Sequence, residues 1–159
     1  MIPDRTPATR VRDLVLDDLD AVVRIDEAHS GRAKPEYWSS VLGDFLRGGE
    51  GPLRVGLAAE ARGQLVGHLL GEVRAFEFGS EPCGWVFAVG VDPDHLREGV
   101  GGSLLAAACR RFAAAGIRRV RTMVRRDDVP VLSFFRAAGL VGGPFVQLEL
   151  DLDPRRTRP

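Results

Sequence analysis

The composition of this 159-residue chain does not point to a metal, a nucleic acid or a membrane as partner. It holds one lysine, no asparagine, and two cysteines, Cys83 and Cys109, whose spacing fits neither a CxxC motif nor a dense disulfide framework. Basic and acidic residues balance at 22 each, so no excess charge favours nucleic acid or an anionic surface as partner. We therefore expect reduced thiols, no bound metal and a small ligand.

Long apolar runs are also missing. None approaches the roughly 18 residues that a membrane span needs, and the N-terminal segment carries Asp and Arg before any apolar run. The sequence thus predicts a cytoplasmic protein without membrane insertion. A hydrophobic content of 45% suffices for one core, so we expect a single domain over 1–159, with 153–159 as a frayed tail.

What is present is a regular alternation of helical and strand-like periodicity. The expected order is a strand near 9–12, helices from Leu19 and Pro35, strands over 54–60, 65–78 and 84–91, a helix over 100–115, a strand over 117–124, a helix over 129–138 and a last strand over 145–152. The strand before the third helix is expected to place Trp85, Phe87, Val89 and Val91 on one face. The strand–helix–strand unit that follows implies two parallel strands.

A glycine loop joins that strand to the helix. The stretch from Val89 to Ser103 reads VGVDPDHLREGVGGS, and glycines at a helix start let a phosphate approach unpaired backbone N–H groups closely. A nucleotide triphosphate loop would need a lysine before Ser103, and a dinucleotide fingerprint would need glycine at Leu104. Both alternatives fail, which leaves another kind of diphosphate ligand or a plain helix cap in which glycine allows tight packing.

The segment VGVDPDHLREGVGGSLL resembles the cofactor motif of the GNAT superfamily of N-acetyltransferases. When Gly99 and Gly101 match the two motif glycines, Leu96 stands where the family has Arg or Gln. Either Arg97 takes that part or backbone donors alone hold the phosphate. The resemblance implies an α/β fold: a mixed, mostly antiparallel sheet of about seven strands, a central parallel pair splayed for CoA, and helices on both faces.

The resemblance also implies acetyl-CoA as co-substrate and assigns the residues that hold it. Backbone groups of Val89 and Val91 would pair with pantetheine, and the Val89 N–H would stabilise the oxyanion formed when an amine attacks directly. Gly90 between them is consistent with a bulge, a close backbone approach or relief of crowding. The expected cofactor-binding residues are Val89, Val91, Arg97, Glu98, Gly99, Val100, Gly101, Gly102, Ser103, Asp128 and Phe135.

The catalytic base is expected to be a carboxylate that acts through ordered water, because the attacking amine must first lose a proton. Glu72 is the first candidate, since it lies in a largely apolar strand next in order to the cofactor strand; the alternative is an ordinary carboxylate that faces outward. Further candidates are Glu77, Glu81, Asp94 and His95.

The proton for the departing thiolate has no obvious donor. The family often has a tyrosine where this chain has Phe135, so acid catalysis by tyrosine is excluded at that position. Water, or less readily Ser133, would deliver the proton, and a thiolate with a pKa near 8.5 leaves tolerably well unassisted. Asp128 either bonds the cofactor or caps the next helix, and capping is the favoured interpretation.

The acceptor is an amine of unknown identity, on a small molecule, a peptide N-terminus or a protein lysine. In the family it is selected by the first two helices and flanking loops, here 28–37 and 75–83. Candidate lining residues are Tyr37, Trp38, Phe76, Phe78 and Trp85, although aromatic residues at such spacing more often belong to the core. Candidate charges are Asp44, Glu77 and Glu81, although a charged loop is usually only solvated.

An active N-acetyltransferase is the first hypothesis for the function. A non-catalytic acyl-CoA-binding or sensor domain is the second, and the same fold without CoA is the third. We expect a monomer or a homodimer, the dimer formed through the last strand.

Overall fold

The computed structural model describes residues 9–75 and 79–153. The chain divides into two compact units, Met1–Val124 and Arg125–Pro159, and each has its own description below. The expectation of a single domain stays a prediction.

The first unit is an α/β structure built on one sheet of five strands in the order β1-β2-β3-β4-β5. Its elements are β1 Arg10–Asp13, η1 Leu16–Asp18, α1 Leu19–Ser30, α2 Pro35–Leu46, β2 Arg54–Ala61, β3 Gln64–Arg74, β4 Cys83–Val91, η2 Pro93–His95, α3 Val100–Ala114 and β5 Val120–Arg121. Neighbouring strands from β1 to β4 are antiparallel, and β4 and β5 are parallel. The sequence predicted the order of helices and strands along the chain and the parallel pair.

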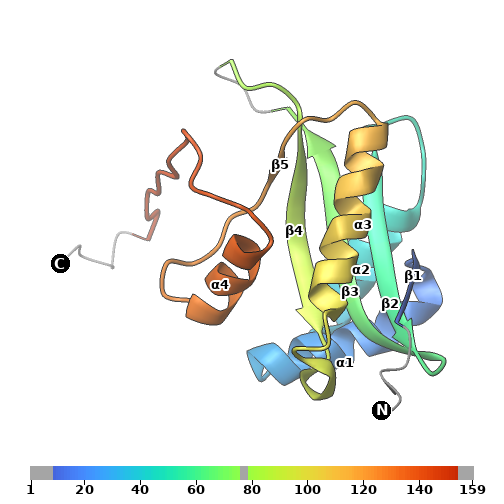
Figure 1. The fold of residues 1–159 in the computed structure, drawn as a ribbon. Helices are drawn as coiled ribbons and strands as arrows, with labels where there is room; N and C mark the ends of the chain where they lie inside the picture. The colour runs from blue at the N-terminus through green and yellow to red at the C-terminus, as the bar shows by residue number, and fades with distance from the viewer. Residues whose placement is uncertain (1–8, 76–78, 154–159) are drawn as a thin grey trace, which may run out of the picture. The chain divides into compact units, whose positions relative to one another are not determined.

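Helices cover both faces of the sheet, as expected: α3 crosses one face, and α1 and α2 lie on the other (Figure 1). Two glycines of the sheet show which helix covers each face. A Cβ on Gly67 would meet Val100 of α3, whereas a Cβ on Gly56 would meet Phe45 of α2. Fully buried leucines fill both layers, and each contributes about 1.5–3 kcal/mol relative to an exposed side chain.

Local signals explain the element ends. Gly31 ends α1 in the left-handed conformation (φ 73°), and Pro35 begins α2 where its missing N–H costs nothing. The β2–β3 turn uses positive φ at Arg62 (53°) and Gly63 (76°), which suits a tight hairpin. Asp18 begins α1, but its carboxylate bonds the Arg12 guanidinium and the Val15 N–H instead of capping the helix.

Two strand predictions need correction. The strand expected over 117–124 is only Val120–Arg121, and the strand expected over 145–152 has no regular pairing in the structure. The latter segment alternates as a strand would, yet Leu148 is 89% exposed and its apolar neighbours in the alternation are exposed as well. Alternation shows that a segment suits a sheet edge, but it does not supply the edge. The described residues therefore give five strands, not seven.

The second unit contains α4, Val129–Ala137. The Asp128 carboxylate caps this helix by accepting a bond from the Val131 N–H at 3.3 Å, which confirms the capping interpretation. Gly139 follows the helix with φ 94°. Residues 154–159, most of the predicted tail, lie outside the described part of the chain.

Candidate acetyl-CoA site

A bulge divides β4 into two halves. The β3–β4 register shifts between Leu70 and Gly71, so that Leu70 faces Ala88 and Gly71 faces Val86, which leaves Phe87 as the extra residue. Phe87 contacts Phe45 of α2, and Ala88 packs into the same layer. The alternation of side chains is therefore broken at this point.

The bulge corrects the expectation that four residues of β4 share one face. A Cβ on Gly84 would meet Phe112 of α3, so the next residue, Trp85, points to the opposite face, as Phe87 does. A Cβ on Gly90 would meet Ile25 of α1, so Val89 and Val91 point toward the α3 face. Periodicity alone carries no signal for the extra residue that causes this change.

The first half of β4 is paired on both edges. Gly84 and Trp85 are in register with Val120 and Arg121 of β5, and the Gly84 N–H bonds the Arg119 carbonyl at 2.9 Å. The Thr122 hydroxyl then donates to the Val86 carbonyl at 2.9 Å. Within the described residues, the strand pairing between β4 and β5 goes no further.

Among the described strands, β3 alone pairs with the second half of β4, and we call the other edge of this half its free edge. The Asp92 N–H bonds the Val66 carbonyl at 2.8 Å, so Asp92 points its backbone groups toward β3. Because these directions alternate along an antiparallel strand, Gly90 also points toward β3, and Val89 and Val91 point away from it. The N–H and C=O groups of Val89 and Val91 thus face the side on which β5 has already ended.

This free edge runs directly into the start of α3. Ser103 makes the first bond of the helix, to the Gly99 carbonyl at 2.9 Å, so the N–H groups of Val100, Gly101 and Gly102 precede the helical hydrogen-bond pattern. Arg97 (φ 66°) and Gly99 (φ 78°) turn the chain sharply before the helix. An anion is stabilised at such a terminus by the N–H groups and by the helix dipole.

A buried carboxylate fixes the start of this loop. Asp92 accepts a bond from the Arg24 guanidinium at 2.6 Å and caps η2 through the Asp94 N–H at 3.0 Å. These two bonds lower the pKa of Asp92, with burial acting in the opposite direction. Asp92 is therefore an anion at neutral pH and ties the loop to α1.

The predicted loop residues come together, with different roles. Val100 is buried against Gly67, so only its backbone is available to a ligand. Glu98 bonds the His95 ring at 2.8 Å, and Leu96, at the family's Arg or Gln position, is 51% exposed. Asp128 and Phe135 belong to the second unit, where Phe135 packs edge to face on Phe134. Their contact with a cofactor stays a prediction.

The structure does not bring Glu72 to Val89. Glu72 faces Trp85 across the sheet, three positions along β3 from Leu69, the residue opposite Val89. Three strand residues span about 10 Å. Its carboxylate pairs with Arg74 at 2.6 Å, and the assignment of Glu72 as base stays a prediction.

The other predicted base and acceptor residues are scattered. Glu81 and Asp94 are exposed. Trp38 is buried in the core, whereas its neighbour Tyr37 is 57% exposed. Phe76, Glu77 and Phe78 lie outside the described residues.

Sequence reasoning missed a buried polar cluster beneath Gly90. It consists of Asp26, Trp38 and His68. The His68 ring lies 5.5 Å from the Trp38 ring, and its Cε1 is 2.5 Å from where a Cβ on Gly90 would stand. Burial lowers the pKa of His68 to about 4, although Asp26 acts against it. A single histidine in an apolar strand was the available signal.

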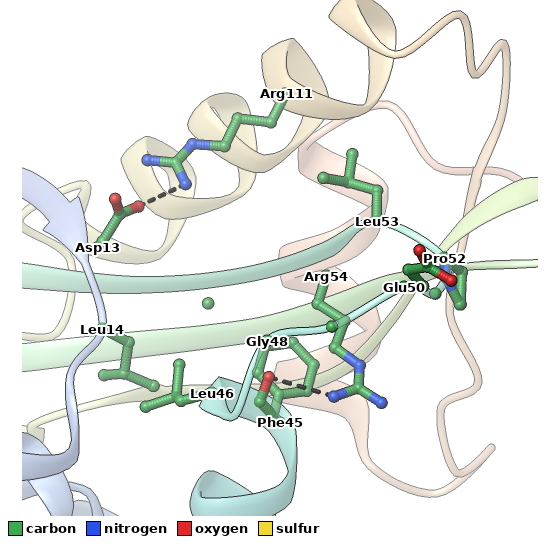
Figure 2. A pocket seen from close by; sticks show the side chains of 13 residues that line it. Asp13, Leu14, Phe45, Leu46, Gly48, Glu50, Pro52, Leu53, Arg54 and Arg111 are labelled. Atoms are coloured by element: carbon green, nitrogen blue, oxygen red, sulfur yellow. Dashed lines mark hydrogen bonds and ion pairs between the residues drawn. The ribbon is translucent and has the colours of Figure 1, made fainter.

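A cavity of the first unit lies elsewhere. A pocket of about 590 Å³ lies between the end of β1, the C-terminal end of α2 and the start of β2 (Figure 2). Arg54 and Arg111 line it, each engaged in a bond of its own, Arg111 with Asp13 and Arg54 with the Asp44 carbonyl at 2.7 Å. No predicted cofactor residue lines this pocket.

The described residues contain no group of three or more His, Cys, Asp or Glu side chains arranged to hold a metal ion. No helix in them has the length and apolarity to cross a membrane.

The fold and the glycine loop define a class of protein that comparison with known families identifies. Residues 19–140 match the acetyltransferase (GNAT) family, and the chain belongs to this family. The family uses acetyl-CoA.

Individual curated relatives match only part of this chain. The chain is 35% identical over 110 residues to mycothiol acetyltransferase of Saccharomonospora viridis, a match covering 67% of this chain and 32% of that protein. A second mycothiol acetyltransferase, from Clavibacter michiganensis, is 42% identical over 53 residues, which cover 33% of this chain and 17% of that protein. The matches thus span about a third or less of these relatives' length.

Solved structures share the fold. The aminoglycoside N-acetyltransferase AAC(6')-Iy in complex with CoA superposes with a TM-score of 0.79 at 17% identity, covering 96% of this chain and 99% of that one. A ribosomal-protein-alanine N-acetyltransferase from Brucella melitensis gives a TM-score of 0.73 at 16% identity, covering 91% and 99%.

Proposed function

We propose that this chain is an acetyl-CoA-dependent N-acetyltransferase that moves an acetyl group to a primary amine by direct attack. One observation carries the proposal: the free edge of β4 at Val89 and Val91 leads, within one continuous loop, to the N-terminus of α3. An extended amide chain and a diphosphate, which are adjacent parts of CoA, need these two features in this order.

The backbone supplies most of the binding chemistry. The N–H groups of Val100, Gly101 and Gly102 hold the diphosphate at the helix start. Val91 pairs with the pantetheine amides, and the Val89 N–H donates to the thioester oxygen as negative charge develops there. Because these donors are backbone groups, Leu96 in the motif does not remove them.

Proton transfer depends on water in this proposal. Phe135 has no hydroxyl, so water delivers the proton to the departing thiolate, and the base acts on the ammonium through ordered water. The names of the relatives, mycothiol and aminoglycoside acetyltransferases, support an amine on a small molecule as acceptor.

Calorimetry with acetyl-CoA, followed by thiol release with a panel of amines, tests the proposal. Binding with turnover above the rate of hydrolysis supports the enzyme. Binding without turnover across the panel supports the alternative, an acyl-CoA sensor of the same fold. Absence of binding overturns both.

A charge at the helix start sharpens this test. Gly102 is exposed, and a Cβ there meets open space, so Gly102→Ala is a matched control for Gly102→Glu. A carboxylate in the first turn stabilises the helix but repels a diphosphate. We expect Gly102→Glu to unfold no more easily than Gly102→Ala, yet to bind acetyl-CoA at least about tenfold more weakly. Equal affinities would place the diphosphate elsewhere.

A further inference from the structure

The free edge of β4 is already in contact with a side chain. His29, in the last turn of α1, bonds the Val91 carbonyl through Nε2 at 2.6 Å. This carbonyl points away from β3, as the direction of the Asp92 N–H requires. His29 therefore occupies one of the backbone acceptors on the edge proposed for the cofactor.

The strand does not need this bond to keep its place. Val91 is in register with Gly67, and Gly90 with His68, so the ladder with β3 extends to the end of β4. The ion pair between Arg24 and Asp92 holds the next residue to α1. Three other contacts thus position the end of β4. The His29 bond mainly occupies an acceptor on the free edge.

The His29 side chain can also move away from the Val91 carbonyl. Its side chain is exposed, and α1 ends two residues later at Gly31. A rotation about its side-chain bonds carries the ring into solvent without displacing the helix.

We propose that His29 and the pantetheine arm of acetyl-CoA compete for the Val91 carbonyl, so that His29 sets cofactor affinity by having to leave before the arm pairs with β4. The inference rests on the proposed function, because it needs the cofactor on this edge. A net hydrogen bond is lost on displacement, which corresponds to about a two- to tenfold weaker affinity than the edge would have without His29.

The test compares the dissociation constants of acetyl-CoA for four proteins by calorimetry: wild type, His29→Ala, His29→Gln and Ser30→Ala. His29→Gln keeps a side-chain N–H donor, and Ser30→Ala changes the next exposed position, where it removes only the bonds between the Ser30 hydroxyl and the Arg32 backbone. We expect His29→Ala to bind about two- to tenfold more tightly than wild type and Ser30→Ala, with His29→Gln between them.

Adenosine 3′,5′-diphosphate, which lacks the pantetheine arm, is the matched ligand control. We expect the same affinity of wild type and His29→Ala for it. Unchanged or weaker binding of acetyl-CoA to His29→Ala overturns the competition, as does equal tightening for both ligands. If wild type binds no acetyl-CoA, the proposed function fails as well. If wild type binds acetyl-CoA and His29→Ala binds it no more tightly, only the competition fails. Thermal unfolding of each variant verifies that all four are folded.

Discussion

Both halves of β4 are part of one strand, but they differ in how their two edges are paired. Before the bulge, the strand is paired on both edges and Gly84 lies against Phe112. After it, Val89 to Val91 are paired with β3 alone, and the other edge is bounded by the His29 side chain. One half is built as sheet interior, and the other is the edge proposed to bind the cofactor.

If the proposed site is right, a single extra residue separates the part of β4 that serves stability from the part that serves binding. A bulge bends a strand and increases its local twist, so the part beyond Phe87 leaves the direction of β5. Substitutions before the bulge should therefore change the free energy of unfolding, and substitutions after it should change cofactor binding or turnover. Three predictions test this separation.

The largest effect is expected from Val89→Pro. Proline removes the N–H proposed to face the thioester oxygen, and it leaves the β3 ladder intact because that N–H points to the free edge. We expect kcat to fall by about a hundredfold or more, as for loss of one oxyanion donor, in a steady-state assay of thiol release.

Val89→Ala is the control, because it keeps the N–H and loses only part of the side chain. We expect its kcat to stay within a fewfold of wild type. Equal losses in both variants would mean that the side chain matters and the N–H does not.

The second effect concerns His68 beneath Gly90. Its pKa falls from 6.5 to about 4 on folding, so the unfolded chain takes up the proton first as the pH drops. This group therefore contributes its full stability above pH 6.5 and loses it down to about pH 4, a change of about 3 kcal/mol in the free energy of unfolding.

Urea unfolding at several pH values measures this slope. We expect His68→Gln to lose the dependence between pH 6.5 and about pH 5, above the range in which the carboxylates of Asp18, Asp26 and Asp92 contribute. A slope that persists in the variant would assign it to other groups.

The smallest effect comes from one methyl group added on either side of the bulge. In Gly84→Ala the new Cβ meets the Phe112 ring at 2.6 Å, and in Gly90→Ala it meets His68 at 2.5 Å. Both are expected to cost about 1–3 kcal/mol in unfolding free energy. Only Gly90→Ala should also raise KM for acetyl-CoA, because it displaces the free edge. A similar KM for both variants would show that the halves are not independent.

Sequence reasoning predicted most of the first unit, since its elements carry strong local signals. Pro35, the positive φ of Gly31 and Gly63, and the glycine loop all have physical requirements that few other residues meet. The order of strands and the parallel pair followed from these signals.

What the sequence could not show depends on contacts between distant segments. The bulge at Phe87 arises from the register between β3 and β4, so it leaves no mark in the local pattern. His68 and His29 acquire their surroundings from α1, α2 and β4 together. Glu72 was favoured for its neighbours in sequence, whereas the register places it opposite Trp85.

The ion pair between Arg24 and Asp92 has an electrostatic consequence. The loop needs the Asp92 carboxylate to cap η2, but a bare negative charge close to a diphosphate site would oppose its ligand. Arg24 of α1 neutralises that charge, because its guanidinium lies 2.6 Å from the Asp92 carboxylate oxygen. The ion pair therefore presents a dipole instead of an anion. The loop thus has a carboxylate anchor whose charge is already neutralised where we propose that the diphosphate binds.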